Sequence, residues 1–382
     1  MRLRLSSILP SGVLALALAV SACGGSAAPA PQPATPAPAK TDAPAKSDAP
    51  AKTDSAAAKP APQATTAAPA KTEAPAKPAQ VVNVKIGALT IFEWVPLFAA
   101  KELGYFERES INAEIVIFRG GSEITQAMLG KSLDVSATTL DRALILAEKG
   151  QLIKNLVSVV NRVTQSIIVR SDVNVAPGDL KALKDKTLGI TSPGSGTDLY
   201  LRYLLKGVGL DPDKDAKIIA VGSGQTAISA LQNKAVDGVN GNDPMVALLV
   251  DVQKSAKMVL DIAKEGPGPF KNMPFVGLQV TDEWLKANPE TAKRIIRAQH
   301  RANEDLRNDP EKALSVAKKY FENLDDNLGR LVLKKHAPLW RSPILPEEMK
   351  VANQVYKELG QITKDIPYED ITVGPELREL WK

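Results

Sequence analysis

The sequence contains very little cysteine and histidine. Its 382 residues include one cysteine, Cys23, and two histidines, His300 and His336. Zinc sites and catalytic metal sites need such side chains at spacings such as CxxC, H-x-x-H or H-E-x-x-H, and none of these patterns occurs. We therefore expect no metal site and no disulfide, so that the folded part is stabilised by its core alone.

Signs of catalysis and of nucleic-acid binding are also missing. The nucleophile motif G-x-S-x-G is absent, and both histidines lie in the C-terminal part, where we expect surface or structural roles. We expect no catalytic residue, no enzymatic activity and no cofactor. The formal charge of +5 is small, and aromatic residues make up 4% of the chain. Without a basic stripe interleaved with aromatic residues, nucleic acid is not an expected partner.

The N-terminal segment is apolar but too short to span a bilayer. Arg2 and Arg4 precede the apolar run from Val13 to Val20, and small residues follow, which is typical of an export signal. Its end, AVSAC, resembles the lipobox of bacterial lipoproteins, in which the cysteine is lipidated after cleavage. This resemblance implies a signal peptide over residues 1–23 and a lipid on Cys23. The expected location is the cell envelope, anchored to a membrane on its periplasmic or extracytoplasmic face.

Residues 24–80 are a low-complexity segment of Ala, Pro, Lys, Thr and Asp, with hexamers such as AKTDAP in succession. Such a composition buries too little apolar surface to offset the entropy of ordering. We expect a disordered tether whose prolines favour extended chain, with a reach on the order of 150 Å.

The remaining residues, 81–382, have the length of two lobes rather than one. Short β-branched runs alternate with amphipathic helical stretches, which is typical of parallel α/β units. The predicted strands are VNVKIGAL, NAEIVIF, LDVSAT, IKNLVSVV, SIIVR, KTLGIT, AKIIAV, VDGVNG, KMVLDI and PFVGLQV. After the last strand the pattern is mainly helical, and we assign no chemistry to that C-terminal segment.

The α/β pattern occurs twice, about one hundred residues apart. KIGALT (85–90) corresponds to TLGITS (187–192), and AMLGKSLD (127–134) aligns without gaps with ALQNKAVD (230–237). The octamers follow similar Gly/Ser loops, RGGSE and GSGQT. Ligands bind at the carboxyl ends of strands in open α/β sheets. Two such halves predict a two-lobed clamp with a ligand between the lobes.

The stretch from Val82 to Ile262 resembles the solute-binding proteins of ABC transporters, of the group that takes aliphatic sulfonates, taurine, nitrate and thiamine precursors. The resemblance implies a two-lobed type II periplasmic-binding-protein fold, an α/β architecture in which each lobe is a mostly parallel sheet flanked by helices, with a C-terminal helical segment. It places lobe 1 at residues 81–165 plus 266–382 and lobe 2 at 166–265. It also implies a monomer whose partners are a small-molecule solute, an ABC permease and its ATPase, and the membrane through the lipid anchor.

The loop TSPGSGTD is the first candidate for ligand contact. Ser195 and Asp198 have the S-x-x-D spacing of a capping box, and the loop offers hydroxyls and unpaired N–H groups at a positive helix end. The alternative is an ordinary N-cap that serves only its own helix. A P-loop is excluded, because no Gly-Lys-Ser/Thr follows. The candidates here are Ser192, Gly194, Ser195, Gly196 and Thr197.

The loop TIFEWVP occupies the equivalent place in the first half. Its candidates are Thr90, Phe92, Glu93 and Trp94. Trp94 either covers a flat or alkyl part of a ligand or packs on its own helix. Further candidates at strand ends or helix starts, each of which is otherwise a cap or turn residue, are Gly121, Ser122, Thr138, Thr139, Thr164, Gln225, Asn242 and Asp243. Arg142, one turn into a helix beyond Thr139, either pairs with an anion or lies on a solvated helix face, and we expect the solvated face.

Two kinds of solute follow from these residues. The helix-end loops favour a small organic anion, a sulfonate or a carboxylate, whereas Glu93, Trp94 and Asp243 favour a flat nitrogenous ligand such as a thiamine-pyrimidine or flavin precursor. A sensory or scaffolding lipoprotein without a role in import is the alternative of another class.

Overall fold

The computed structural model describes residues 80–382. Every described residue belongs to one unit of the chain, residues 73–382. The predicted signal peptide, the predicted lipidation site Cys23 and the predicted tether lie outside the described residues, apart from Gln80 at the end of the tether. Among the described residues, no helix is long and apolar enough to cross a membrane.

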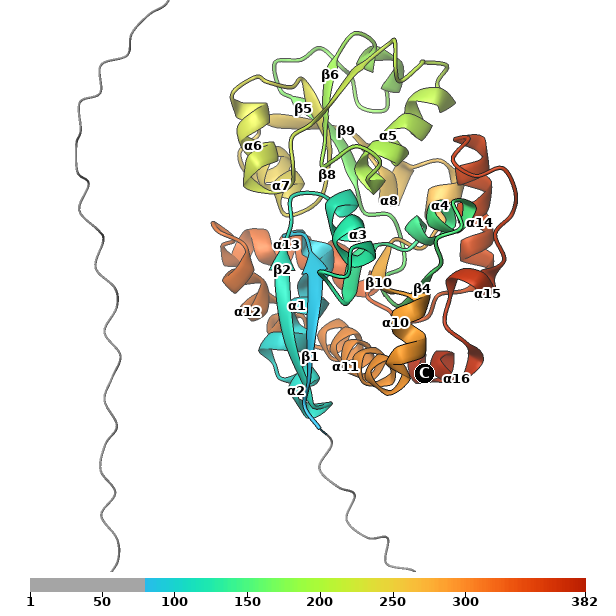
Figure 1. The fold of residues 1–382 in the computed structure, drawn as a ribbon. Helices are drawn as coiled ribbons and strands as arrows, with labels where there is room; N and C mark the ends of the chain where they lie inside the picture. The colour runs from blue at the N-terminus through green and yellow to red at the C-terminus, as the bar shows by residue number, and fades with distance from the viewer. Residues whose placement is uncertain (1–79) are drawn as a thin grey trace, which may run out of the picture. The chain divides into compact units, whose positions relative to one another are not determined.

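Within residues 80–382, ten strands form two five-stranded mixed sheets, one in each lobe (Figure 1). All ten lie within one or two residues of the predicted runs. The first sheet has the order β2-β1-β3-β10-β4, with the strands β1 (Val82–Ala88), β2 (Ile111–Ile117), β3 (Val135–Thr139), β4 (Ile153–Val160) and β10 (Val276–Thr281). The second has the order β7-β6-β8-β5-β9, with β5 (Ser166–Arg170), β6 (Thr187–Ile190), β7 (Lys217–Ala220), β8 (Gly238–Gly241) and β9 (Ala256–Asp261).

Each sheet is mostly parallel and has one reversed strand in the same place. In the first sheet β10 runs antiparallel to both β3 and β4, and in the second β5 runs antiparallel to both β8 and β9. The chain crosses from the first sheet to the second through residues 161–165 and returns through residues 262–275. The first lobe, around the first sheet, therefore depends on a strand that follows the whole second lobe.

The internal repeat is confirmed down to single hydrogen bonds. In the first copy, the Asp134 carboxylate accepts the N–H of Lys85 at 2.8 Å, and in the second, Asp237 accepts the N–H of Thr187 at 2.8 Å. Lys131 and Lys234, equivalent in the two octamers, both adopt a left-handed backbone at φ of 60° and 58°. The two halves share the same turn from helix to strand.

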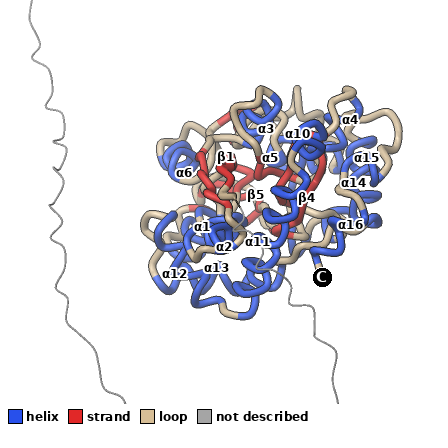
Figure 2. Tube along the Cα trace, turned by 60° about the horizontal axis from the view of Figure 1, so that its bottom comes forward, coloured by secondary structure: helices blue, strands red, loops and turns tan. Residues whose placement is uncertain are grey.

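Helices surround the strands, which lie in the interior (Figure 2). Those of the two α/β units are α1 (Val95–Glu102), α2 (Tyr105–Arg108), α3 (Gly121–Leu129), α4 (Arg142–Glu148), α5 (Gly196–Gly207), α6 (Gln225–Gln232) and α7 (Met245–Ala247). The second crossing carries α8 (Ile262–Glu265) and α9 (Gly268–Lys271). The C-terminal segment consists of α10 (Asp282–Ala287), α11 (Pro289–Asn308), α12 (Pro310–Tyr320), α13 (Asp326–His336), α14 (Pro346–Glu358), α15 (Tyr368–Ile371) and α16 (Pro375–Arg378).

The long helix α11 shows why the C-terminal segment packs on the first lobe. Its buried residues recur at helical spacing, as in Ala292, Ile295, Ile296 and Gln299. This face packs against α1, α2 and β4. The burial of that stripe, rather than helix propensity, holds the segment in place.

A buried ionic cluster joins the second lobe to the C-terminal segment. Asp243, which follows β8, accepts a hydrogen bond from His336 Nε2 at 3.0 Å and forms an ion pair with Lys335 Nζ at 3.2 Å, both on α13. Lys335 also lies 3.5 Å from Asp261 at the end of β9. The His336 ring packs against Phe92 of the first lobe, with centroids 5.4 Å apart. The cluster therefore ties all three parts of the chain together.

Burial and pairing act in opposite directions on this cluster. Burial raises the pKa of the Asp243 carboxyl, but the hydrogen bond from His336 and the charge of Lys335 outweigh it, so that this pKa lies well below its usual value. Burial lowers the pKa of Lys335, but the charges of Asp243 and Asp261 outweigh it and hold this pKa above its usual value. Both residues are therefore ionised at neutral pH.

We expect Asp243→Asn to lower the free energy of unfolding by about 3 kcal/mol at neutral pH, because it leaves the buried Lys335 with Asp261 as its remaining counter-charge. The pKa of Asp243 is lowered on folding, so its contribution is complete above the usual carboxyl pKa of about 4 and is lost as the pH falls below it. Urea unfolding between pH 7 and pH 3 should show the gap between the wild type and the variant narrowing below about pH 4.

Two variants control this measurement. The double variant Asp243→Asn, Lys335→Met removes both charges and should recover part of the loss. Asp172→Asn, in an exposed pair with Lys234 at 3.0 Å, should leave the urea midpoint nearly unchanged. An equal effect of Asp172→Asn and Asp243→Asn would contradict a special role for the buried cluster.

A second prediction concerns the returning strand. A Cβ at Gly277 in β10 would overlap the carbonyl oxygen of Val157 and the side chain of Leu140. Gly277→Ala should therefore shift β10 against β4 and lower the melting temperature by several degrees. Gly207→Ala, at the end of α5 with no atom within 4 Å of its Cβ, should cause no loss. Equal melting temperatures for the two variants would be evidence against this tight fit.

Candidate functional site

Two neighbouring cavities lie in the cleft between the lobes, at the carboxyl ends of the strands. The larger has a volume of about 370 Å³ and is lined by residues that follow β1, β2, β6, β7 and β8. The smaller has a volume of about 30 Å³ and is lined by residues that follow β1, β3 and β6 and by the two crossings. Ile91, Thr191 and Asn242 belong to both walls, so the two cavities are adjacent.

The loop that precedes α5 is held by its own hydroxyl and carboxylate groups. Ser195 is the N-cap and accepts the N–H of Asp198 at 3.4 Å, as the S-x-x-D spacing predicts. The Asp198 carboxylate accepts the N–H of Gly194 at 2.7 Å, one residue before the position of a standard capping box. Thr191, Ser195 and Thr197 bond to one another through their hydroxyls at 2.8–2.9 Å. Hydrogen bonds among its own residues therefore hold the shape of this loop.

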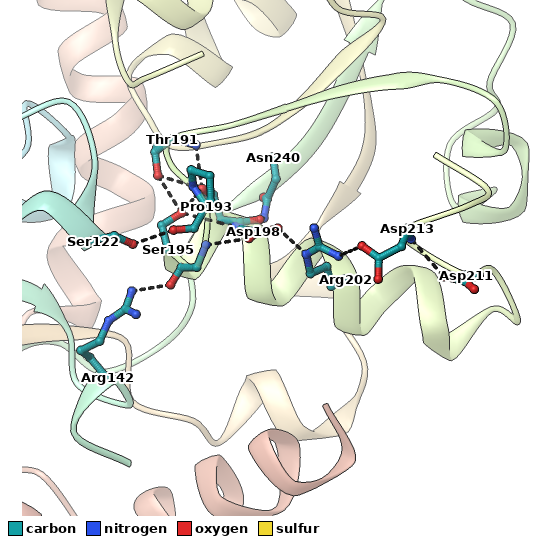
Figure 3. A network of polar contacts seen from close by, with 12 residues as sticks. Ser122, Arg142, Thr191, Pro193, Ser195, Asp198, Arg202, Asp211, Asp213 and Asn240 are labelled. Carbon is teal, nitrogen blue, oxygen red and sulfur yellow. Dashed lines mark hydrogen bonds and ion pairs between the residues drawn. The ribbon is translucent and has the colours of Figure 1, made fainter. Parts of the chain in front are cut away.

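The first lobe binds this loop through two carbonyl oxygens (Figure 3). Ser122 Oγ, at the start of α3, donates to the carbonyl of Pro193 at 2.8 Å. Arg142 Nη2, at the start of α4, donates to the carbonyl of Gly194 at 2.5 Å. On the same side of the cleft, the buried Tyr200 of α5 donates to Asp141 of the first lobe. The lobes are therefore in direct contact beside the smaller cavity.

Arg142 was expected on a solvated helix face, and this expectation was wrong. Its residue is 9% exposed, and it forms part of the wall of the smaller cavity. Arg142 is buried because the loop of the second lobe covers the start of α4. This contact joins residues that are 52 positions apart in the sequence, so helical periodicity does not reveal it.

The smaller cavity has an excess of hydrogen-bond donors. The indole N–H of Trp94 and the Nε of Arg142 are buried and have no hydrogen-bond partner. The first residues of two helices, Gly121 of α3 and Gly196 of α5, also line it. Helix starts carry partial positive charge and free N–H groups. No aspartate or glutamate lines this cavity, so its walls favour a group that accepts hydrogen bonds and carries negative charge.

Glu93 does not contribute a carboxylate to either cavity. It is fully buried, and its Oε1 accepts hydrogen bonds from Thr164 at 2.5 Å and from Asn242 at 2.8 Å. Phe92 is buried beside it and packs against Phe321, with centroids 5.7 Å apart. Glu93 thus links the first lobe, the first crossing and the second lobe.

The structure brings eleven of the seventeen predicted ligand-binding residues to the walls of these two cavities. Those at the smaller cavity are Trp94, Gly121, Thr138, Thr139, Ser195, Gly196, Thr197 and Asn242. Those at the larger are Thr90, Gln225, Asp243 and again Asn242. The predicted residues that line neither cavity are Phe92, Glu93, Ser122, Thr164, Ser192 and Gly194.

The main residues that sequence reasoning missed lie in the C-terminal segment. Residues 320–324 and Leu328, at the junction of α12 and α13, form one wall of the larger cavity. Lys335 and His336 hold Asp243 from behind that wall. The structural role expected of His336 is confirmed by its complete burial and its bond to Asp243. No local signal marks these residues, because their partners lie more than ninety positions away.

Comparisons with known proteins place the chain in a family. The model of the NMT1-like family matches residues 77–320, more than half of the chain. The nitrate/nitrite binding protein NrtA of Nostoc sp. is 27% identical over 57% of this chain, which spans about half (52%) of that relative. The riboflavin-binding protein RibY of Chloroflexus aurantiacus is 24% identical over 69% of this chain and 74% of that protein.

Other similarities extend to an enzyme and to a solved structure. The 4-amino-5-hydroxymethyl-2-methylpyrimidine phosphate synthase of Schizosaccharomyces pombe is 22% identical over 71% of this chain and 79% of that protein. The alkanesulfonate-binding protein SsuA of Xanthomonas axonopodis pv. citri, solved with bound MOPS, superposes with a TM-score of 0.64 at 18% identity, covering 76% of this chain and 97% of that one. The chain therefore belongs to the NMT1-like family and has the two-lobed α/β fold of periplasmic binding proteins.

Proposed function

We propose that this protein is the extracytoplasmic solute-binding component of an ABC importer, and that its solute is a small organic molecule with a carboxylate or sulfonate group. Relatives that bind nitrate or riboflavin and a structural neighbour that binds alkanesulfonates support the receptor role. The export signal and the lipidated Cys23 expected from the sequence suit a receptor that stays near its permease.

The proposal that the solute is an anion rests on the unpaired hydrogen-bond donors around the smaller cavity. Trp94 and Arg142 each have a buried N–H group without a partner, and an unmade hydrogen bond at a buried donor costs about 1–3 kcal/mol. A carboxylate or sulfonate oxygen satisfies such donors and also gains from the two helix starts beside them. The volume of about 30 Å³ suits a head group of this size, because one water needs roughly 10–15 Å³.

The favoured mechanism is closure of the two lobes around the solute. Ser122 and Arg142 already connect the first lobe to the loop of the second, at 2.8 and 2.5 Å. A solute that contacts Trp94 on one lobe and the start of α5 on the other binds the closed state more tightly than the open one. This difference in affinity shifts the population toward closure, which a permease can then recognise.

A flat nitrogenous solute is supported less well. Its case depended on Glu93 and Asp243 as acceptors for amino groups. Glu93 keeps one buried oxygen, Oε2, without a partner, but it lines neither cavity. Asp243 is paired with His336 and Lys335. A binding role rather than catalysis remains our proposal, although one relative is a synthase.

Trp94→Phe tests the anion site, because it keeps an aromatic ring and removes the indole N–H group together with the five-membered ring that carries it. We expect it to weaken binding of the best carboxylate or sulfonate by about tenfold or more, since a hydrogen bond to a charged group contributes roughly 1.5–3 kcal/mol. A thermal-shift panel at neutral pH selects the solute, and isothermal titration calorimetry on the full chain measures its affinity.

The matched control is Trp381→Phe. The Trp381 indole N–H donates to the carbonyl of Leu156 at 2.8 Å and lines neither cavity. This variant should lose stability and keep the wild-type affinity. If no carboxylate or sulfonate shifts the melting temperature of the wild type, or if Trp94→Phe binds as tightly as the wild type, the anion proposal is wrong.

A further inference from the structure

The larger cavity lies on one flank of the cleft, where α6 of the second lobe and the α12–α13 segment both approach the end of β2 (Figure 1). Its volume of about 370 Å³ is more than ten times that of the adjacent smaller cavity. This volume falls within the range of roughly 300–1,000 Å³ that is typical of pockets for organic ligands.

The walls of the larger cavity are mainly apolar. Ile91 and Ile117 come from the first lobe, Val221 and Ile228 from the second, and Phe321 and Leu324 from the C-terminal segment. Ile117 is 48% exposed, which is unusual for a large apolar side chain in this protein and places apolar surface at the cavity. Contact with apolar matter is therefore the main interaction that these walls offer.

The charged groups of the larger cavity do not make it an ion site. The Asp243 carboxylate is bonded to His336 and Lys335 behind the wall. Arg119 and Glu322 have opposite charges, and both side chains belong to exposed residues. The excess of donors is confined to the smaller cavity, next to Trp94 and Arg142.

The wall from the C-terminal segment is held firmly. Tyr320 donates to Glu102 of α1 at 2.9 Å and stacks on Phe98 with centroids 4.0 Å apart. Phe321 packs against Phe92. A wall anchored in this way keeps its shape. The size of the cavity therefore determines which solutes fit.

We propose that the larger cavity is the subsite for the body of the solute, and that the solute class is an organic acid with an aromatic or branched aliphatic body. This inference rests on the proposed function, because it assumes that the acidic group occupies the adjacent smaller cavity. A small inorganic oxyanion fills only the smaller cavity and leaves the apolar walls in contact with water. The protein therefore discriminates against such ions, and each buried CH₂ group raises the affinity roughly fourfold.

A graded series of ligands tests this inference. Isothermal titration calorimetry on the full chain compares methanesulfonate, butanesulfonate, octanesulfonate and naphthalenesulfonate, the matching carboxylates, and nitrate. We expect the affinity to rise at least a hundredfold from the one-carbon acids to the best large acid, and nitrate to bind no better than the one-carbon acids.

Two variants on α6 test whether the affinity for large acids depends on the space in the larger cavity. Thr226 lies on α6, has an exposed side chain and lines the larger cavity, so Thr226→Phe reduces the space there. Gln232 is also exposed on α6 but does not line this cavity. We expect Thr226→Phe to lower the affinity for the large acids at least tenfold and to leave the one-carbon acids unchanged, whereas Gln232→Phe leaves both unchanged.

The outcomes separate the two proposals. Three outcomes would overturn the subsite and leave the proposed anion receptor in place. They are an equal affinity for all acids of the series, binding of nitrate as tight as that of the best organic acid, and equal affinities of Thr226→Phe and Gln232→Phe for the large acids. If no acid of any size binds, the proposed function fails and the subsite with it. Circular dichroism spectra that match the wild type show that both variants are folded.

Discussion

The whole architecture depends on one strand that arrives late in the chain. The fourth position of the first sheet is occupied by β10, which lies between β3 and β4 and follows the whole second lobe in the sequence. The chain must therefore cross between the sheets twice, and the two crossings hold the strand ends of both sheets toward one cleft. Gln165 in the first crossing and Phe275 in the second both line the smaller cavity. The site is thus located by the same constraint that completes the fold.

The cleft keeps its carboxylates away from the place where an anion is proposed to bind. Glu93 and Asp243 are both buried near the centre of the molecule, where an uncompensated charge is costly. Glu93 accepts two hydrogen bonds from neutral side chains, and Asp243 is paired with Lys335 and His336. Among the described residues that line the smaller cavity, the donors of Trp94 and Arg142 are the buried side-chain groups without a hydrogen-bond partner. The adjacent larger cavity provides mainly apolar surface, so the two parts of the cleft suit the two ends of an amphiphilic solute.

Much of the fold was predictable, because its signals are local. Alternating β-branched runs marked all ten strands, and the two octamers marked a repeated turn that includes the left-handed Lys131 and Lys234. The Ser195 cap formed as its spacing predicts. The candidate site was predictable only in outline. Loops at strand ends pointed to the correct edge. The neighbours that cover each side chain decide the rest, because Trp94 lines a cavity whereas the adjacent Glu93 is covered and lines none.

The sequence by itself determined the strands, the duplicated unit and the edge at which loops from both halves meet, since periodicity and capping act over a few residues. Only the tertiary structure decided which polar groups face the cleft. Arg142 became buried through the carbonyl of Gly194, 52 residues away, and Asp243 was paired with Lys335 and His336 of the C-terminal segment. The order of strands in each sheet was decided in the same way, by pairings such as Gly277 with Thr138. Such contacts depend on how separate elements pack, and no local pattern in the chain encodes them.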